Sequence, residues 1–423
     1  MKRLKALAGT AALALGLSAC SMLNVNASDT LNGSMLITES GTYTISEDVE
    51  GSVVVDASDD DVIEIILDGC SITSEDSAAI YVRNAGEVTV TAAEGTVNYL
   101  TNLTGFEADG DTNVDGVIFS KDDLTISGEG TIIIDSADHG IVSKDDLIIE
   151  SGTITITSAG DGCQANDELI INGGSLEITE CTEGLEGTSV TINGGDIAIL
   201  SSDDAVNAAG ESGDSMTADS ACSITINGGT LDITTEGDGI DSNGSLTVNG
   251  GYITISGPLN SGNGSLDYVG SGVITGGTIV AAGISGMEMN FTEASQGSIL
   301  ISTGDQTSGT AITVTDDSGN VIVEFTPEVN YNCVLISSPE LTLSGTYTVT
   351  CGEFEEEITL ENYIFGNGAG GFGFGGGRQG PQGGFNGQTP PELPDDFDGQ
   401  TPPELPDNFD GQMPPVQPQT NQR

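Results

Sequence analysis

The chain repeats itself between residues 140 and 195, where it reads GIVSKDDLIIESGTITITSAGDGCQANDELIINGGSLEITECTEGLEGTSVTINGG. Gly140-Ile141-Val142 returns as Gly162-Cys163-Gln164 after 22 residues, and as Gly184-Leu185-Glu186 after another 22. A fixed interval of this size is typical of a solenoid, in which each repeat forms one coil and packs on its neighbours. The stretch therefore predicts stacked coils of about 22 residues.

The motif Asn-Gly-Gly marks the same interval over a longer part of the chain. It begins at Asn172, Asn193, Asn227 and Asn249, and a Thr-Gly-Gly variant begins at Thr275. The long interval of 34 residues equals one coil of 22 plus an insertion of 12, and the polar segment Gly210–Ala221 has that length. Asn and Gly tolerate the positive φ of a sharp turn, so each motif predicts a turn between strands.

Short runs of alternating residues flank these turns, such as Ile154-Thr155-Ile156 and Leu176-Glu177-Ile178. Two such runs in each repeat predict half-buried strands. Identical turns at one-coil intervals stack best when each repeat lies over the previous one, which makes the strands parallel and about 4.8 Å apart. We therefore predict an all-β fold, a right-handed parallel β-helix with Ile, Val and Leu inside. The blades of a β-propeller need about 40 residues, so the period argues against that fold.

The composition agrees with a β-solenoid and excludes one class of function. Aromatic residues make up 4% of the chain and Trp is absent, so the core is built from small and β-branched side chains, which favour strands. The chain has 65 acidic and 8 basic residues, with a formal net charge of −57. A nucleic-acid binder neutralises phosphates with Lys and Arg, so we expect no nucleic-acid partner.

The N-terminus has the pattern of a bacterial lipoprotein leader. Basic residues in Met1–Lys5 precede an apolar run over residues 6–17, which is too short for a stable membrane span. Leu17-Ser18-Ala19-Cys20 resembles the lipobox, in which the Cys receives a lipid and becomes the mature N-terminus. We predict a signal peptide over 1–19, a linker over 20–29 from the lipidated Cys20, and anchoring on the outer face of the bacterial cell membrane.

The remaining chain divides into three parts. We predict the parallel β-helix over residues 30–289, a C-terminal β cap or module over 290–365, and a disordered Gly/Pro-rich tail over 366–423. Export permits disulfides, and Cys333 and Cys351 flank two predicted strands of the cap. Small buried thiols are the alternative, and no Cys spacing fits a zinc site.

Acidic and amide residues recur at two positions of each repeat, and stacking would bring those of successive coils one strand spacing apart. Asp161, Glu183, Asp204 and Asp238 occupy the first position, Gln164, Glu186, Asn207 and Asp241 the second, and Asp203 and Asp267 fall close to the same corner. Carboxylates at such spacing repel each other, and a hard cation relieves the repulsion. Calcium takes six to eight oxygen ligands of these kinds. We predict a Ca²⁺ site, with a solvent-exposed edge neutralised by diffuse ions as the alternative.

Several segments resemble the clostridial carbohydrate-binding family with a polysaccharide-lyase-like β-helix. They are GIVSKDDL at Gly140, GLEG at Gly184, ITINGGTL at Ile224, GDGIDSNG at Gly237 and NSGNGSLDY at Asn260. The resemblance covers about residues 50–350. It implies a calcium-bearing β-helix that binds acidic, pectate-like and cellulose-like polysaccharides at the cell surface, without an established catalytic role. The sequence departs from the family at Cys163, where an aliphatic residue is expected, and at Ala205-Val206, which replaces a Gly-Ile pair.

Two main function classes follow, a binding protein and an enzyme. As a binding protein, the chain would use calcium to bridge its acids to the carboxylates of polygalacturonate. As a lyase, it would need a base for the C5 proton of the uronate and a cation for the developing enolate. Lys144 and Lys121 are the candidate bases, although both can instead pair with acids of their own turns, namely Asp122, Asp123, Asp145 and Asp146.

A structural or adhesive surface protein is the third possibility. Flat aromatic platforms commonly bind sugar faces, and this chain has few. Tyr252 and Tyr268 are the nearest candidates, so we expect calcium-mediated binding of acidic glycans to be stronger than cellulose binding. The expected partners are therefore a polysaccharide and, through the lipid anchor, the membrane.

Overall fold

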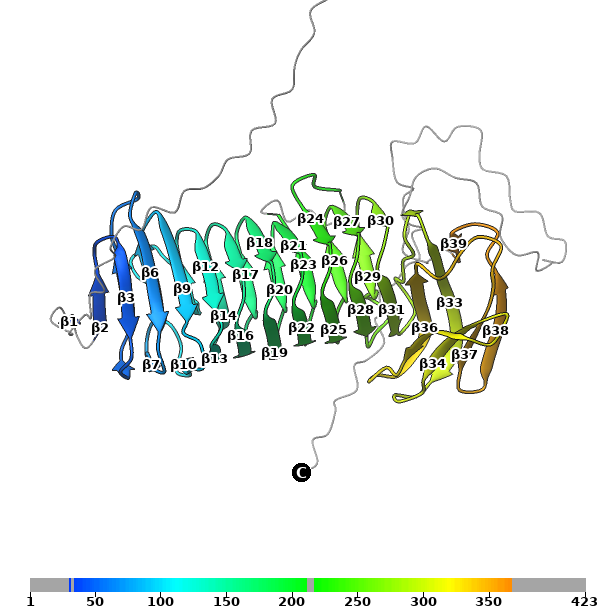
Figure 1. Ribbon diagram of the computed structural model, residues 1–423, viewed down its shortest axis with the longest axis horizontal. Coiled ribbons are helices and arrows are strands. Elements are labelled where there is room, and N and C mark those ends of the chain that lie inside the picture. The colour runs from blue at the N-terminus through cyan, green and yellow to red at the C-terminus, as the bar shows by residue number, and fades with distance from the viewer. Residues whose placement is uncertain (1–29, 32–33, 211–216, 367–423) are drawn as a thin grey trace, which may run out of the picture. The chain divides into compact units, whose positions relative to one another are not determined.

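The computed structural model describes residues 30–31, 34–210 and 217–366, and every regular element in these ranges is a β-strand (Figure 1). The predicted signal peptide, Cys20 and linker lie outside them, as do residues 367–423 of the predicted tail and the centre of the predicted insertion. Nowhere in the described ranges is there a helix long and apolar enough to cross a membrane.

Most of the described chain winds through coils of three strands, one in each of three long sheets. The first sheet contains, in spatial order, β1 (Thr30–Leu31), β2 (Ser34–Ile37), β5 (Val53–Asp56), β8 (Ile80–Asn84), β11 (Gly116–Ser120), β14 (His139–Ser143), β17 (Cys163–Ala165), β20 (Leu185–Gly187), β23 (Val206–Ala208), β26 (Ile240–Ser242) and β29 (Leu266–Tyr268). The second sheet contains β3 (Gly41–Ile45), β6 (Val62–Leu67), β9 (Glu87–Ala92), β12 (Leu124–Gly128), β15 (Leu147–Ile149), β18 (Glu168–Ile171), β21 (Ser189–Ile192), β24 (Ser223–Ile226), β27 (Ser245–Val248), β30 (Gly272–Ile274) and β32 (Glu293–Ala294).

The third sheet joins the coils to the C-terminal strands. It contains β4 (Val49–Glu50), β7 (Ser71–Thr73), β10 (Val97–Asn102), β13 (Thr131–Ser136), β16 (Thr153–Ser158), β19 (Ser175–Cys181), β22 (Asp196–Ser201), β25 (Thr230–Thr235), β28 (Tyr252–Ser256), β31 (Thr278–Gly283), β36 (Tyr331–Ser338), β33 (Gly297–Gln306) and β39 (Ile364–Phe365). Strands of successive coils pair in parallel, as β13, β16 and β19 do. The predicted parallel β-helix is therefore confirmed.

Each coil has three strands, where the sequence predicted two alternating runs. The additional strand belongs to the first sheet and is only three residues long in several coils, such as β17 and β20. Three residues are too few to show an alternating pattern, so this strand appeared in the sequence only as the residues that follow the repeated glycine.

Stacked aliphatic side chains fill the interior. One row on the third sheet links equivalent positions of seven coils, each 0–3% exposed: Ile132, Ile154, Leu176, Ile197, Leu231, Ile253 and Ile279. Burying one such side chain stabilises a fold by about 1.5–3 kcal/mol. Because the row continues through these seven coils, each of them packs like against like on its neighbours in the row.

Two kinds of glycine explain the repeated motifs. The second Gly of Asn-Gly-Gly has a positive φ, 89° at Gly174 and 98° at Gly195, as the motif predicted. The glycine that precedes the short strand is needed for a different reason. A Cβ added at Gly162 would lie 2.6 Å from Ile178 Cδ1 and 2.7 Å from the carbonyl oxygen of Gly184, so no larger residue fits there without displacement.

The asparagines of the same motif form a hydrogen-bonded ladder along the outside. Each amide donates through Nδ2 to the Oδ1 of the coil before it, as Asn193 does to Asn172 at 2.8 Å. The bonds of 2.7–2.9 Å run in one direction, through Thr275, Asn249, Asn227, Asn193, Asn172 and Glu150. The predicted insertion leaves this order intact, since Ser189 of β21 still pairs with Ser223 of β24.

Antiparallel strands cap the C-terminal end of the coils. β36 pairs antiparallel with β31 and with β33, and a further sheet follows. That four-stranded sheet has the order β35 (Val321–Phe325), β34 (Ile312–Asp316), β37 (Thr346–Cys351) and β38 (Phe354–Thr359). Val280 of β31 packs in one cluster with Ile336 and Val349, so the cap shares a core with the last coil.

The six cysteines among the described residues are buried free thiols. Cys333 lies in β36 and Cys351 in β37, and no disulfide joins them in the described structure. Burial raises the pKa of the Cys333 thiol to about 12. These cysteines therefore act as small apolar side chains of the core.

Candidate functional site

Polar side chains at the start of the first-sheet strands form a corner column. Its members are His139, Asp161, Glu183, Asp204 and Asp238. Side chains in this column accept hydrogen bonds from the backbone N–H of the next coil. The N–H of Glu183 donates to Asp161 Oδ1 at 3.1 Å, and that of Asp238 donates to Asp204 Oδ1 at 2.7 Å. These residues therefore bind successive coils to each other as well as carrying charge.

A second row, the outer column, runs along the first sheet itself. Successive coils place ten residues opposite one another in register: Leu36, Val54, Tyr81, Phe119, Val142, Gln164, Glu186, Asn207, Asp241 and Asp267. The first five are apolar or aromatic, and the last five carry amides or carboxylates. One row of the same sheet thus has an apolar half and a polar half.

Three carboxylates meet in the polar half, where the two columns adjoin. One oxygen from each of Asp204, Asp238 and Asp241 lies within 4.8 Å of the others, and we name this group the acidic triad. Burial raises the pKa of Asp204 to about 6, of Asp238 to about 7 and of Asp241 to about 8, and repulsion from neighbouring carboxylates adds to the shift. Protons or a cation must therefore neutralise part of this charge at neutral pH.

Asn207 and Glu183 adjoin the triad. Asn207 Nδ2 donates to Glu183 Oε2 at 2.8 Å, while Asn207 Oδ1 is buried and accepts no hydrogen bond from any described residue. Burial raises the pKa of Glu183 to about 8. A buried carbonyl oxygen without a donor is costly, and a cation would satisfy it.

The oxygen atoms of this group fit a hard cation. Asp204, Asp238 and Asp241 offer carboxylate oxygens and Asn207 offers an amide oxygen, which are the ligand types that calcium accepts. The triad includes no His or Cys, so it does not resemble a zinc site. These four residues are the ones that would hold an ion.

The acids of the two columns that precede the triad in the sequence, Asp161 and Glu186, have protein partners instead. His139 Nδ1 lies 3.0 Å from Asp161 Oδ2, and Gln164 Nε2 donates to Glu186 Oε2 at 2.5 Å. Burial alone would raise the pKa of Asp161, but the hydrogen bond and positive charge of His139 outweigh it and lower that pKa. Asp161 therefore has a partner within the chain and lies apart from the acidic triad.

Lys144 lies beside the border between the two halves of the outer column. Its Nζ is 3.4 Å from Gln164 Oε1, 3.7 Å from Asp115 Oδ1 and 5.5 Å from the centroid of the Phe119 ring. A cavity of about 470 Å³ opens next to it and is also lined by Gln164 and Glu186. The sequence allowed Lys144 to pair with acids of its own turn, but within the described structure it pairs with Asp115.

The other candidate base has different surroundings. Lys121 occupies the equivalent position one coil earlier, because Ser120 pairs with Ser143, and its side chain is exposed. It does not line the cavity beside Lys144. The two lysines are thus distinguished by environment, although the sequence made them equivalent.

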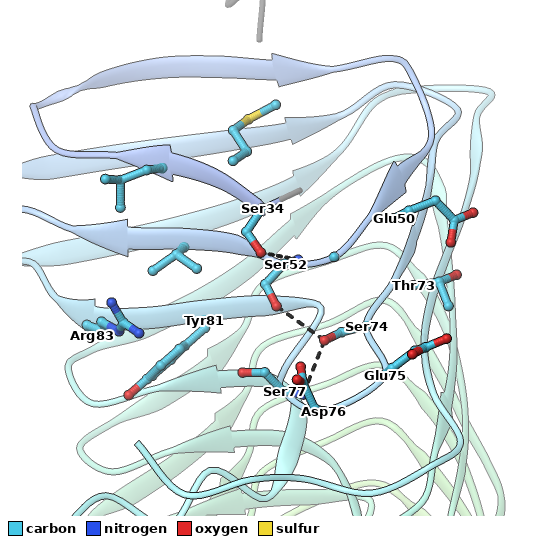
Figure 2. Close-up of a pocket in the computed structure, with 14 residues that line it drawn as sticks. Ser34, Glu50, Ser52, Thr73, Ser74, Glu75, Asp76, Ser77, Tyr81 and Arg83 are labelled. Carbon is cyan, nitrogen blue, oxygen red and sulfur yellow. Dashed lines mark hydrogen bonds between the residues drawn. The ribbon is translucent and has the colours of Figure 1, made fainter. Parts of the chain in front are cut away.

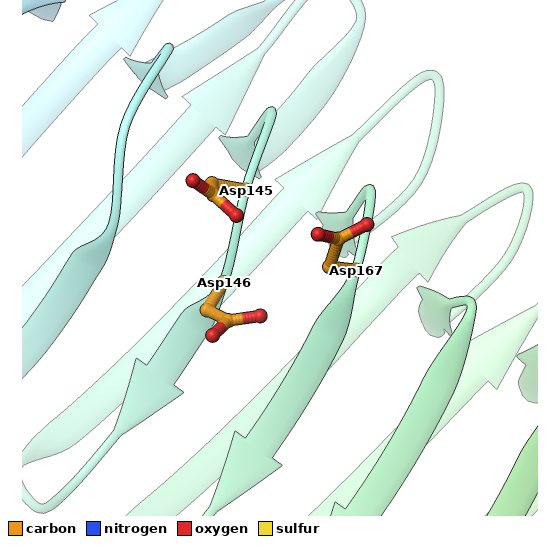
Figure 3. A group of neighbouring side chains, drawn as sticks. All are labelled: Asp145, Asp146 and Asp167. Carbon is orange, nitrogen blue, oxygen red and sulfur yellow. The ribbon is translucent and has the colours of Figure 1, made fainter.

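A separate acidic group lies at the turn between the first and second sheets (Figure 3). Oxygens of Asp145, Asp146 and Asp167 lie within 4.8 Å of one another, and Figure 3 shows Asp167 on the turn next to that of Asp145 and Asp146. Asp145 and Asp167 are exposed, and Asp146 Oδ1 accepts the backbone N–H of Glu168 at 3.0 Å. Water and dissolved ions screen these charges, so the half-buried acidic triad has the greater need of a cation.

The segment over residues 103–115 covers the aromatic part of the apolar half. Phe106 packs on the cluster of Tyr81 and Phe119, whose ring centroids are 5.7 Å apart. Asp109 of the same segment accepts a hydrogen bond from the Tyr81 hydroxyl at 2.9 Å and pairs with Arg83 Nε at 2.8 Å. The sequence did not predict this cover, because the segment carries no repeat motif.

Comparison with known proteins places the chain in a family. The family model for carbohydrate-binding domain-containing proteins matches residues 32–213 and 187–264, which together span more than half of the 423 residues. The chain belongs to this family. A carbohydrate-binding domain-containing protein of Acetivibrio thermocellus is 34% identical over 117 residues. That match covers 27% of this chain and 41% of the relative, so it spans less than half of the relative's length.

A solved structure is also similar to this member of the carbohydrate-binding family. It is described as the polysaccharide lyase-like protein from C. thermocellum, in a gadolinium derivative. The sequence identity is 28% and the TM-score 0.43, and the match covers 58% of this chain and 94% of that one.

The remaining predicted site residues take different positions around the triad. Asp267 follows Asp241 in the outer column, and burial raises the pKa of its carboxyl group. Asp203 is exposed.

The two departures from the family pattern lie in the core, where Cys163 and Val206 are both 0% exposed and each pairs with Leu185 of β20. Both substitutions thus keep an apolar side chain inside the coil.

Proposed function

We propose that the protein is a noncatalytic polysaccharide-binding lipoprotein of the cell surface, which binds acidic, pectate-like glycans with Ca²⁺. The observation that carries this proposal is the acidic triad beside the orphaned Asn207 Oδ1, since protons or a cation must neutralise its buried charge. Membership of the carbohydrate-binding family supports a glycan as the partner. The lipobox at Cys20 supports the surface location, and the family resemblance extends the range of ligands to cellulosic glycans.

Calcium also accounts for how an acidic protein can bind an acidic polymer. With a formal net charge of −57, the chain repels polygalacturonate at long range. A divalent cation held by Asp204, Asp238 and Asp241 would leave coordination positions for a uronate carboxylate, because calcium accepts six to eight oxygens. The protein would then bind this ligand only when the cation is present.

Retention on polygalacturonate tests the proposal. We expect the protein to be retained in calcium and released by a chelator. Asp241→Asn should abolish retention while raising the melting temperature of the metal-free protein, because it removes a buried repelling charge. Asp196→Asn is the matched control, since Asp196 is exposed on the third sheet. Equal retention with calcium and with chelator would contradict the calcium bridge.

The alternative function is a calcium-dependent lyase acting on uronate polymers, with Lys144 or Lys121 as the base. The cavity beside Lys144 favours Lys144, because only that lysine lines a space next to Gln164 and Glu186. An absorbance assay for unsaturated uronate ends separates the two functions. Product that forms with the natural protein and with Lys121→Ala, but not with Lys144→Ala, would establish the lyase and overturn noncatalytic binding.

A further inference from the structure

A second cavity lies at the N-terminal end of the outer column, at the opposite end from the acidic triad (Figure 2). Its volume is about 450 Å³, within the usual range for small-molecule sites of roughly 300–1,000 Å³. Figure 2 shows Tyr81 and Arg83 on one side and Glu50, Thr73 and Glu75 on the other. The cavity lies on the apolar half of the column and has no part in the proposed calcium site.

The floor of this cavity is apolar. Leu36 and Val54 belong to the outer column, as Tyr81 does, but both are only half-buried, whereas Tyr81 is 2% exposed. The segment that covers Tyr81 and Phe119 therefore leaves these two aliphatic side chains open. They offer the kind of surface on which the C–H face of a sugar ring packs.

Hydroxyl and carboxylate groups form the walls. Ser52 Oγ and Ser74 Oγ lie 3.3 Å apart, and Ser74 Oγ also accepts the backbone N–H of Ser77 at 3.2 Å. Glu75 and Asp76 are exposed, and their carboxylates accept no hydrogen bond from the described part of the chain. Free carboxylates are acceptors for hydroxyl donors, which sugars carry on most carbons.

Arg83 supplies donors at a fixed position. Its Nε pairs with Asp109 at 2.8 Å, and its guanidinium carbon lies 5.2 Å from the centroid of the Tyr81 ring. These two contacts orient the group beside the Tyr81 hydroxyl. A guanidinium has five N–H donors, so it can also donate to a hydroxyl or ring oxygen of a ligand.

The charge of the cavity selects the class of ligand. Glu50, Glu75 and Asp76 line it, and Arg83 is the only cation in its lining and already pairs with Asp109. An acidic sugar would meet net repulsion here, whereas a neutral one could use the carboxylates as acceptors. We propose that this N-terminal cavity is a calcium-independent binding site for a neutral polysaccharide chain.

Calorimetric titration of the full chain tests this site. The probes are cellohexaose, xylohexaose and mannohexaose, with hexagalacturonate as the acidic comparison, all in the presence of a chelator. We expect at least one neutral hexasaccharide to bind and hexagalacturonate not to bind. Val54→Arg, which fills the floor, should weaken binding about tenfold or more, and Glu75→Gln should weaken it about three- to tenfold, because a neutral amide oxygen is a weaker acceptor than a carboxylate.

Two controls separate this site from the triad and from misfolding. Glu129→Gln removes an exposed carboxylate elsewhere on the coils and should leave affinity unchanged, as should Asp241→Asn. Glu75 is exposed, so its substitution tests the cavity even if Val54→Arg fails to fold. Calcium-dependent retention on polygalacturonate can fail while this site persists, so the two proposals fail separately.

Three outcomes would overturn the proposal. In the first, no neutral hexasaccharide binds the full chain. In the second, binding is unchanged by both Val54→Arg and Glu75→Gln, or is lost in Asp241→Asn. In the third, the natural protein self-associates and Val54→Arg abolishes that association, which would assign the cavity to a second copy of the chain.

Discussion

The two halves of the outer column share one backbone but differ in chemistry. In the apolar half, Phe119 and Val142 are 0% exposed and lie under the segment over residues 103–115. In the polar half, Glu186 and Asp241 occupy the same ladder positions and repel neighbouring carboxylates. The inward-facing residues hardly change between the halves, with Ile141, Leu185 and Ile240 all fully buried. A β-helix can therefore change its outer chemistry from coil to coil without changing its fold.

The difference also determines what each half needs from outside the coils. The apolar half needs a cover, and the chain supplies one through Phe106 and Asp109. The polar half has buried charge that the described chain does not neutralise at Asp204, Asp238 and Asp241. Calcium should therefore stabilise the protein through the polar half alone.

Phe119→Ala should give the largest loss of stability, because it removes a large side chain from the core of the apolar half. Phe119 is fully buried between Tyr81 and Val142, and truncating such a side chain costs about 3–5 kcal/mol. We expect that loss of unfolding free energy in denaturant titrations, with the stabilisation by calcium unchanged. Tyr99→Ala is the control, since Tyr99 is 48% exposed. Loss of the calcium response in Phe119→Ala would show that the halves are not independent.

The pH dependence of stability should show an effect of intermediate size, and it tests the carboxyl groups of the polar half. The pKa is about 8 at Glu183 and Asp241 and about 7 at Asp238, against about 4 in an unfolded chain. The folded state thus binds more protons, so the metal-free protein should lose stability as pH rises from about 4 to 8. Below about pH 4 this contribution is fully present.

Calcium should reverse the trend, because it replaces the protons. We expect its addition to raise the melting temperature by about 5 °C or more near pH 8, and by much less near pH 5. Asp241→Asn should flatten both curves. An equal calcium effect at the two pH values would mean that the raised pKa groups do not bind the ion.

Gln164→Val should give the smallest effect, because it only moves the border between the apolar and polar halves of the outer column by one coil. Gln164 donates to Glu186 at 2.5 Å, and a hydrogen bond to a carboxylate contributes about 1.5–3 kcal/mol. The new Val would pack beside Val142, its neighbour in the column, and offset part of that loss. Denaturant unfolding measures the change, with calcium binding unaffected. A loss as large as that of Phe119→Ala would show that the border itself is essential.

The sequence predicted those parts of the molecule that repeat. Asn172-Gly173-Gly174 and the alternating runs around it indicated the coil, because turn geometry and burial impose the same residues in every repeat. The spacing also indicated that Asp204 and Asp238 stack. Stacking alone could not separate Asp161, which pairs with His139, from the triad, because that depends on the reach of individual side chains.

Features outside the repeat could not be predicted in this way. The covering segment has no motif, and its contacts through Asp109 and Asp115 join residues that are distant in the sequence. The short strand of each coil was missed because three residues show no periodicity. In this protein the repeated residues indicate the coils, whereas residues outside the repeat determine which parts of the outer face are covered and which are open.

The asparagine ladder gives each coil a hydrogen-bond donor on one side and an acceptor on the other, so a coil can follow another of its own kind. Each amide donates to the coil before it and accepts from the coil after it, as Asn227 does between Asn193 and Asn249. A duplicated coil would find the same acceptor on one side and the same donor on the other. Gene duplication could therefore lengthen the solenoid without creating a new interface, and the outer columns of the added coil would be free to acquire a new specificity.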